Sequence, residues 1–200
     1  MKRLLHVGCG QKNKSRTTKG FNTNDWKEIR YDIDESVNPD FTGSMIDMSI
    51  IEDASVDAVF SSHNIEHLYA HEVPIALSEF HRVLSASGML VITCPDLRSV
   101  CELVVEDKLD DPAYVSPAGP IAPIDILYGH RASMERGNLY MAHKCGFTRK
   151  VLVGSLKGSG FKSVVSMSRK GPSFDLWAIA TKNRCDEESL RALTDQHFPK

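Results

Sequence analysis

Near the start of the chain, two glycines follow directly on a run of apolar residues, in the segment Leu4-Leu5-His6-Val7-Gly8-Cys9-Gly10. An apolar run that ends in Gly-x-Gly predicts a buried strand whose exit turn lies close to a ligand. Glycine at positions 8 and 10 permits positive φ angles and leaves the backbone N–H groups uncovered by side chains. The pattern is typical of strand–turn units that bind nucleotides, although a Gly-x-Gly alone is weak evidence.

Two acidic residues follow at a useful distance from these glycines. The segment Trp26 to Asp34 predicts a second strand, and it ends in Asp32 and Asp34. In a doubly wound sheet, a carboxylate at this strand end lies beside the ribose of the ligand and can accept hydrogen bonds from both hydroxyls. We predict that Asp32 does so and that Asp34 is the second candidate. The alternative for either acid is to cap the turn at Glu35-Ser36.

The rest of the hydrophobic pattern alternates between strands and helices and predicts an α/β fold. The expected elements are a short strand and turn over 41–48, a strand over 57–63, a helix over 73–84 that Gly88 ends, an apolar strand over 89–94, a helix through 151–156 capped by Thr148, and a hairpin over 161–167 and 174–181. A continuous apolar strand such as 89–94 is typical of the centre of a parallel sheet.

Composition limits the class of protein. At 200 residues and 42% hydrophobic content, a single domain over 1–200 is expected. A net charge of −2 disfavours a nucleic-acid partner. The five cysteines are scattered without a Cys-x-x-Cys pair, which predicts reduced thiols and a cytoplasmic location. Neither a signal-peptide pattern nor an apolar run long enough for a bilayer is present, so no membrane partner is expected.

In its order of motifs, the chain resembles the class I (Rossmann-like) S-adenosylmethionine-dependent methyltransferases, and among them the small bacterial methyltransferase-domain proteins of type 11. Four blocks carry the resemblance: Leu5-His6-Val7-Gly8-Cys9-Gly10, Tyr31-Asp32-Ile33-Asp34, Ser55-Val56-Asp57-Ala58-Val59 with His63-Asn64-Ile65-Glu66-His67-Leu68, and Phe80-His81-Arg82-Val83-Leu84 with Gly88-Met89-Leu90-Val91-Ile92. The resemblance implies transfer of a methyl group from S-adenosylmethionine, with S-adenosylhomocysteine as product.

The same resemblance implies a mostly parallel seven-stranded sheet with helices on both faces and an antiparallel C-terminal hairpin. The hairpin distinguishes this family from nicotinamide-dependent dehydrogenases, which also need a third glycine where this chain has Lys12 and Asn13. The implied cofactor-binding residues lie at the carboxyl ends of the strands: Val7, Gly8, Cys9, Gly10, Asp32, Ile33, Ser44, Met45, Asp47, Ser62 and His63.

The chain departs from the family pattern in two places. His6 stands where an acidic residue is usual, two positions before the first glycine. The stretch 11–24 is polar and lacks the apolar stripe of an amphipathic helix, so it is expected to be a loop that folds over the ligand.

The segment 97–145 is the only candidate for substrate specificity and is predicted to be an irregular, proline-rich flap after the fifth strand, with a short helix near 126–135. Residues 183–200 are expected to form a tail. A small-molecule acceptor is predicted, with the flap either covering it or forming a homodimer contact. The candidates are His130 and His143 as catalytic bases and Tyr128, Arg131 and Tyr140 as substrate-binding residues.

Two other functions stay open at this stage. The first is a non-catalytic module that binds S-adenosylmethionine or S-adenosylhomocysteine. The second is a zinc hydrolase, because His63, Glu66 and His67 form an H-x-x-E-H pattern like that of inverted zinc proteases, with Glu135 as a conceivable third ligand. His63 is expected at a strand end rather than inside a helix, so we predict no metal.

Overall fold

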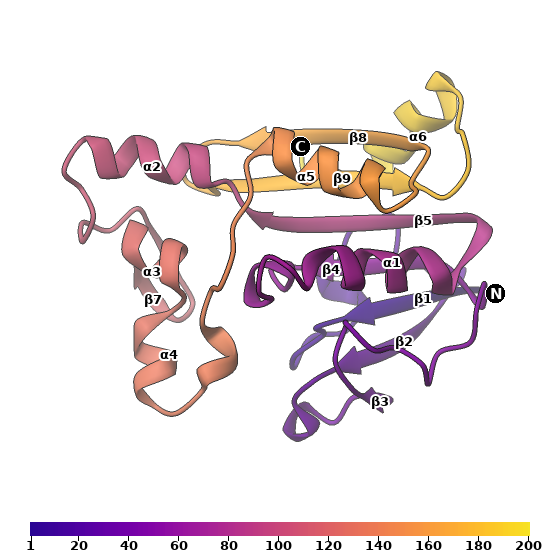
Figure 1. The fold of residues 1–200 in the computed structure, drawn as a ribbon, viewed down its shortest axis with the longest axis horizontal. Coiled ribbons are helices and arrows are strands. Elements are labelled where there is room, and N and C mark those ends of the chain that lie inside the picture. The colour runs from indigo at the N-terminus through magenta and orange to yellow at the C-terminus, as the bar shows by residue number, and fades with distance from the viewer.

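The computed structural model describes all residues 1–200 and contains a seven-stranded sheet (Figure 1). Its strand order is β3-β2-β1-β4-β5-β9-β8, in which the first five strands are parallel and β9 runs antiparallel to both of its neighbours. The strands are β1 (Lys2–Val7), β2 (Trp26–Asp32), β3 (Phe41–Thr42), β4 (Val56–Ser62), β5 (Leu84–Pro95), β8 (Ser163–Arg169) and β9 (Asp175–Thr181). This architecture confirms the predicted fold class, including the antiparallel hairpin.

Helices cover the two faces of the sheet. Along β1, side chains alternate between the faces, so that Leu5 joins the larger core while Leu4 joins a smaller one. The larger core packs against α1 (Val73–Val83) and α5 (Arg149–Gly158), whereas the smaller core meets α6 (Glu187–His197). None of the helices combines the length and the apolar character needed to cross a membrane.

The short strand and turn expected over 41–48 are confirmed, with a two-residue β3, and the helix expected over 73–84 is confirmed as α1, which ends at Val83. The helix-ending role predicted for Gly88 is wrong, because β5 already begins at Leu84, with a break in its register against β4. A Cβ at Gly88 would lie 2.9 Å from the Leu84 side chain. Gly88 therefore permits close packing in this irregular part of β5 rather than ending a helix.

The polar stretch 11–24 has no long helix, as predicted, and its second half is anchored to the sheet; that the stretch covers a ligand stays a prediction. It contains only the short 3-10 helix η1 (Lys14–Arg16). Phe21 is fully buried and packs against Trp26, Phe60 and the ring of His197 in α6. A helix from the predicted C-terminal tail thus covers the sheet face together with Phe21.

The flap after β5 is more regular than expected. It contains α2 (Leu97–Val105), a hairpin of β6 (Tyr114–Ser116) and β7 (Gly119–Ile121), α3 (Pro123–Tyr128), α4 (Arg131–Glu135) and the 3-10 helix η4 (Leu139–Met141). Its own small cluster of buried side chains includes Val100, Ile121 and Ile126. Because these side chains form a small buried core, the insertion folds into short helices and strands, and its prolines lie within or between these elements. Figure 1 shows this insertion beyond the carboxyl ends of β4 and β5.

The contact between α6 and the anchored stretch predicts a pH-dependent stability. His197 is 2% exposed, and its Nδ1 lies 2.6 Å from Thr18 Oγ1. Burial lowers the pKa of His197 to about 4, whereas an unfolded histidine has a pKa of about 6.5. As the pH falls from about 6.5 to 4, His197 therefore becomes protonated in the unfolded chain but stays neutral in the folded chain. We expect this linkage to cost about 3 kcal/mol of stability over that interval.

The matched variant is His197→Gln, which cannot titrate. Urea unfolding of both proteins at pH 7 and pH 4.5 gives the loss of unfolding free energy for each. We expect the variant to be less stable at pH 7 but to lose less stability on acidification, since all other titrating groups are shared. Equal losses in the two proteins would mean that His197 does not contribute to the acid sensitivity.

Candidate active site

The turn after β1 presents two glycines in the left-handed region, with φ angles of 64° at Gly8 and 52° at Gly10. A Cβ at Gly8 would lie 1.9 Å from Oδ1 of Asn64, whereas a Cβ at Gly10 would meet nothing within 4 Å. Between them, Cys9 is buried, and burial raises the pKa of its thiol to about 11. Gly8 is therefore required by the packing, while Gly10 faces open space.

Asp32, the last residue of β2, is held against this turn. One carboxylate oxygen accepts the Gly10 N–H at 2.7 Å and the other accepts the Asp34 N–H at 3.0 Å. Each oxygen retains a second lone pair, so the carboxylate can accept further hydrogen bonds. Asp34 itself accepts the amide of Ser36 at 2.9 Å, which is the capping role considered from the sequence. The side chain of Ile33 between the two acids is 48% exposed.

The turn after β3 is fixed through its backbone. The Tyr31 hydroxyl donates to the carbonyls of Ser44 and Asp47, at 3.0 and 3.1 Å. The Asp47 carboxylate accepts hydrogen bonds at Ser49, and these lower its pKa. Met45 packs in part against the larger core. The structure thus gives Asp47 a capping role, and contacts of Ser44, Met45 or Asp47 with adenine stay predictions.

At the end of β4, the structure brings together two predicted residues and one that sequence reasoning missed. Ser62 shares a hydrogen bond of 2.8 Å with Thr93 of β5, and His63 adopts a φ of 54°. Asn64 was missed, although its amide donates to the carbonyls of Val7 and Ser62 at 3.0 and 3.1 Å. Asn64 therefore joins the ends of β1 and β4 directly beneath the glycine turn.

Arg30 of β2 is a second residue that the sequence did not reveal. Its guanidinium donates to four backbone carbonyls around the site, those of Gly10, Lys12, Val37 and Asn38. Backbone carbonyls carry no sequence signature, so nothing in the pattern could have identified these partners. Arg30 ties the glycine turn to the loop that follows Asp32.

His6, at the position where the family has an acid, does not line the site. Its ring is 3% exposed and packs edge-on against Phe60, with centroids 5.3 Å apart. Its Nδ1 lies 2.8 Å from the carboxylate of Glu28 on β2. Burial lowers the pKa of His6 although Glu28 opposes the shift. His6 therefore serves the packing of the sheet.

The H-x-x-E-H pattern does not form the helical arrangement of a zinc protease. His63 lies outside the short 3-10 helix η3 (Ile65–His67), and Glu135 is exposed on α4 in the insertion. Glu66 is 1% exposed, and His63 Nδ1 lies 3.4 Å from its carboxylate. Burial disfavours the charged forms of both groups. Their mutual attraction opposes this effect, so the pKa of His63 is raised and that of Glu66 is lowered.

The insertion joins this loop through its returning arm. The amides of Lys144 and Cys145 donate to the Glu66 carbonyl at 2.9 and 3.2 Å. The ring of His143 lies edge-on to that of His67, with centroids 4.9 Å apart. Of the two predicted bases, His143 is thus beside the end of β4.

The other predicted residues of the insertion have mixed surroundings. Nδ1 of His130 lies 2.7 Å from Oγ of Ser133. Arg131 is paired with Asp125 at 2.8 Å and with Asp110 at 2.9 Å, so its charge already stabilises the insertion. The remaining two, Tyr128 and Tyr140, are exposed. Substrate contacts by these residues stay predictions.

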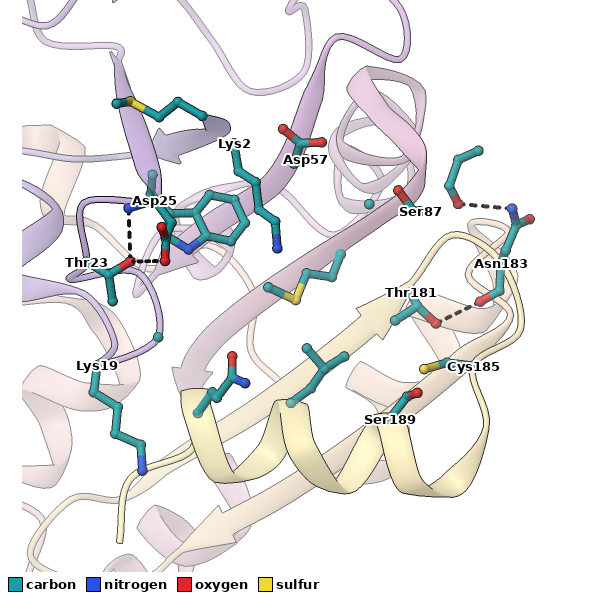
Figure 2. A pocket seen from close by; sticks show the side chains of 18 of the residues that line it. Lys2, Lys19, Thr23, Asp25, Asp57, Ser87, Thr181, Asn183, Cys185 and Ser189 are labelled. Atoms are coloured by element: carbon teal, nitrogen blue, oxygen red, sulfur yellow. Dashed lines mark hydrogen bonds between the residues drawn. The ribbon is translucent and has the colours of Figure 1, made fainter.

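A large cleft of about 1530 Å³ lies elsewhere (Figure 2). It is lined by Lys2 and Asp57 near the amino ends of β1 and β4, and by Ser189 of α6. None of the predicted site residues borders it. Ligands of parallel sheets bind beyond the carboxyl ends of the strands, so the glycine turn, and not this cleft, is the candidate active site.

Comparisons with known proteins bear on the fold and the type of reaction. Residues 5–92 match the family model described as "Methyltransferase domain". No curated protein matches the chain in sequence. Among similar solved structures is an S-adenosylmethionine-dependent methyltransferase from Archaeoglobus fulgidus, which is 17% identical, with 90% of this chain and 86% of that chain covered and a TM-score of 0.56. A second, from Methanosarcina mazei, is 15% identical, with 90% and 92% covered and a TM-score of 0.59. A third is 1,6-didemethyltoxoflavin-N1-methyltransferase from Burkholderia thailandensis with bound 1,6-didemethyltoxoflavin and S-adenosylhomocysteine, which is 15% identical, with 92% and 72% covered and a TM-score of 0.58.

The residues at the carboxyl edge fit this cofactor. The space beside Gly10 leaves room for a group that approaches the backbone, and a side chain there would fill it. Asp32, fixed against the same turn, keeps acceptor capacity for ribose hydroxyls. The match of residues 5–92 to the methyltransferase-domain model, the sheet order and this fit agree: the chain has the Rossmann-like fold of the S-adenosylmethionine-dependent methyltransferases that it resembles, and its carboxyl edge suits their cofactor.

Proposed function

We propose that the protein methylates a small-molecule acceptor that binds between the carboxyl edge of the sheet and the insertion 97–145. The observation that carries this proposal is the attachment of the insertion: its returning arm is hydrogen-bonded to Glu66, just after β4. The arm therefore lies next to the residues that follow Ser62, at the same edge of the sheet as the glycine turn. An element in that place can both select an acceptor and keep water away from it.

Each part of the edge has a role in this proposal. The amides of Gly8, Cys9 and Gly10 already donate to the Tyr31 carbonyl and the Asp32 carboxylate, so the turn offers the cofactor the open space beside Gly10 rather than free N–H donors. Asp32 accepts the ribose hydroxyls. Ile33 offers an exposed apolar surface beside Asp32, suited to one face of the adenine. Ser44, Met45, Asp47, Ser62 and His63 are the further cofactor contacts expected. When bound, S-adenosylmethionine supplies an electrophilic methyl group.

The acceptor side is assigned to the insertion. The exposed rings of Tyr128 and Tyr140 can flank an acceptor, and Arg131 is the third substrate-binding candidate of the insertion. His130 and His143 are the candidate bases where the acceptor must lose a proton. A net charge of −2 favours a small molecule over a nucleic acid. The Burkholderia thailandensis enzyme, whose structure contains 1,6-didemethyltoxoflavin, is a related fold that takes a small molecule. The five free cysteines support a reducing, cytoplasmic setting.

The test is transfer of a labelled methyl group. The purified protein is incubated with methyl-labelled S-adenosylmethionine and a cell extract that has been separated into low-molecular-mass and macromolecular fractions. We expect label to enter the low-molecular-mass fraction, and we expect none with Asp32→Ala. Label found only in protein or nucleic acid would contradict a small-molecule acceptor while leaving methyl transfer intact.

A further inference from the structure

Glu66 is the most unusual buried group that the proposed reaction does not use. It lies 1% exposed in η3, and both of its carboxylate oxygens are buried without a hydrogen-bond partner. The only cationic contact is with His63, whose side chain is 47% exposed and whose Nδ1 is 3.4 Å from Oε1. A buried carboxylate that lacks hydrogen bonds is costly, so such a group points to a missing partner.

Two histidines near this carboxylate have one ring nitrogen held by the backbone. His67 Nδ1 lies 3.1 Å from the carbonyl of Ala142, and His143 Nδ1 lies 2.8 Å from the carbonyl of Ile126. A carbonyl only accepts, so Nδ1 of each ring carries the hydrogen. The lone pair of each neutral ring is therefore on Nε2. Metal-binding histidines commonly have their second nitrogen held in this way.

The ligand atoms are close together before any ion is present. One atom each from Glu66, His67 and His143 lies within 4.8 Å of the others. Two imidazoles and one carboxylate form a donor set that binds Zn²⁺ with three protein ligands and leaves a fourth position open. A modest contraction brings such atoms to metal-binding distances of about 2.0–2.2 Å.

We propose that Glu66, His67 and His143 bind a divalent transition-metal ion, with Zn²⁺ as the reference metal, and that this ion fastens the insertion to the end of β4. The site differs from the zinc set conceivable from the sequence, because Glu66 and His143 take the place of His63 and Glu135 as ligands. It also departs from the sequence-based prediction that no metal is bound. While the ion is bound, Nε2 of His143 is occupied, so His143 cannot serve as a base.

The experiment measures metal directly and uses neither cofactor nor acceptor. The full chain is produced with zinc supplementation and without a histidine tag, and its metal content is determined by mass spectrometry. We expect about one zinc per chain. After removal of the metal, a competition titration with a zinc indicator gives the affinity. For Glu66→Gln and for His143→Gln we expect a loss larger than the about 10–100-fold typical of outer-shell changes.

The matched control is His71→Gln, an exposed histidine four residues beyond His67 that is stacked on Tyr69. It should retain zinc with unchanged affinity. Stoichiometric zinc in either ligand variant, or its absence from the unmodified protein, would overturn the proposal. Since binding of S-adenosylhomocysteine is measured separately, either result leaves the proposed methyl transfer to its own test.

A measurement on the unmodified protein covers the case in which a variant fails to fold. X-ray absorption at the zinc edge should show only nitrogen and oxygen neighbours, at about 2.0–2.2 Å. Cys145 is the alternative metal ligand in this region, because its thiol lies 3.4 Å from the carbonyl of Ile65, the residue before Glu66. A sulfur neighbour at about 2.3 Å would therefore contradict the proposed ligand set.

Discussion

Asp32→Ala is expected to lower the affinity for S-adenosylhomocysteine by at least about 100-fold, which corresponds to about 2.7 kcal/mol. Two effects combine in this loss. The carboxylate no longer accepts the ribose hydroxyls, and charge-assisted hydrogen bonds contribute about 1.5–3 kcal/mol. The Gly10 N–H also loses its partner at 2.7 Å, so the turn is less well fixed. Calorimetric titration of both proteins measures the change.

Asp34→Ala is the matched control, because it removes an acid two positions away on the same loop. The Asp34 carboxylate accepts the amide of Ser36 and has no contact with the glycine turn. Its affinity should stay within a few-fold of the unmodified protein. The account would be wrong about the acid if Asp34→Ala abolished binding while Asp32→Ala bound normally.

Alanine at the two glycines should affect different properties: mainly folding stability at Gly8 and mainly ligand affinity at Gly10. At Gly8, alanine displaces Asn64, whose Oδ1 would lie 1.9 Å from the new Cβ. Two carbonyls then lose their donor, at about 1–3 kcal/mol for each buried group. The positive φ adds about 1–2 kcal/mol. We expect Gly8→Ala to lower the free energy of unfolding by about 3–8 kcal/mol.

At Gly10, alanine meets no protein atom within 4 Å, so the fold should lose only the about 1–2 kcal/mol of backbone strain. Its Cβ instead enters the space assigned to the cofactor, and binding of S-adenosylhomocysteine should fall by at least about 10-fold. Urea unfolding and calorimetry on both variants separate the effects. Unchanged affinity in a folded Gly10→Ala protein would show that the turn does not approach the ligand.

The strand pattern and the first motif were predictable because local sequence determines them. The apolar run Leu4 to Val7 places β1, and positive φ at the two glycines follows from their missing side chains. Asp32 was predictable because the end of β2 always lies beside the end of β1 in such a sheet. These features depend on few long-range contacts.

The residues that hold the site together were not predictable, because their partners are distant or are backbone atoms. Asn64 contacts Val7 across 57 positions, and Arg30 donates only to carbonyls. Neither type of contact leaves a recurring spacing in a single sequence.

The covering elements show the same limit. Within 183–200, which the sequence indicated only as a tail, α6 packs Leu193 and Phe198 on a sheet face that the stretch 11–24 leaves without a helix. The sequence of 183–200 alone does not show that this sheet face needs a cover, because the face exists only once the sheet is formed. In the insertion, the short helices and the hairpin are stabilised by one another rather than by local propensity, so prolines alone suggested an irregular flap.

The most direct measurement is a crystal structure of the protein with S-adenosylhomocysteine. The account predicts the nucleoside at the carboxyl edge, with both ribose hydroxyls within hydrogen-bond distance of Asp32 and the ligand passing over Gly10. A nucleoside bound elsewhere, for example in the large cleft beside α6, would contradict it.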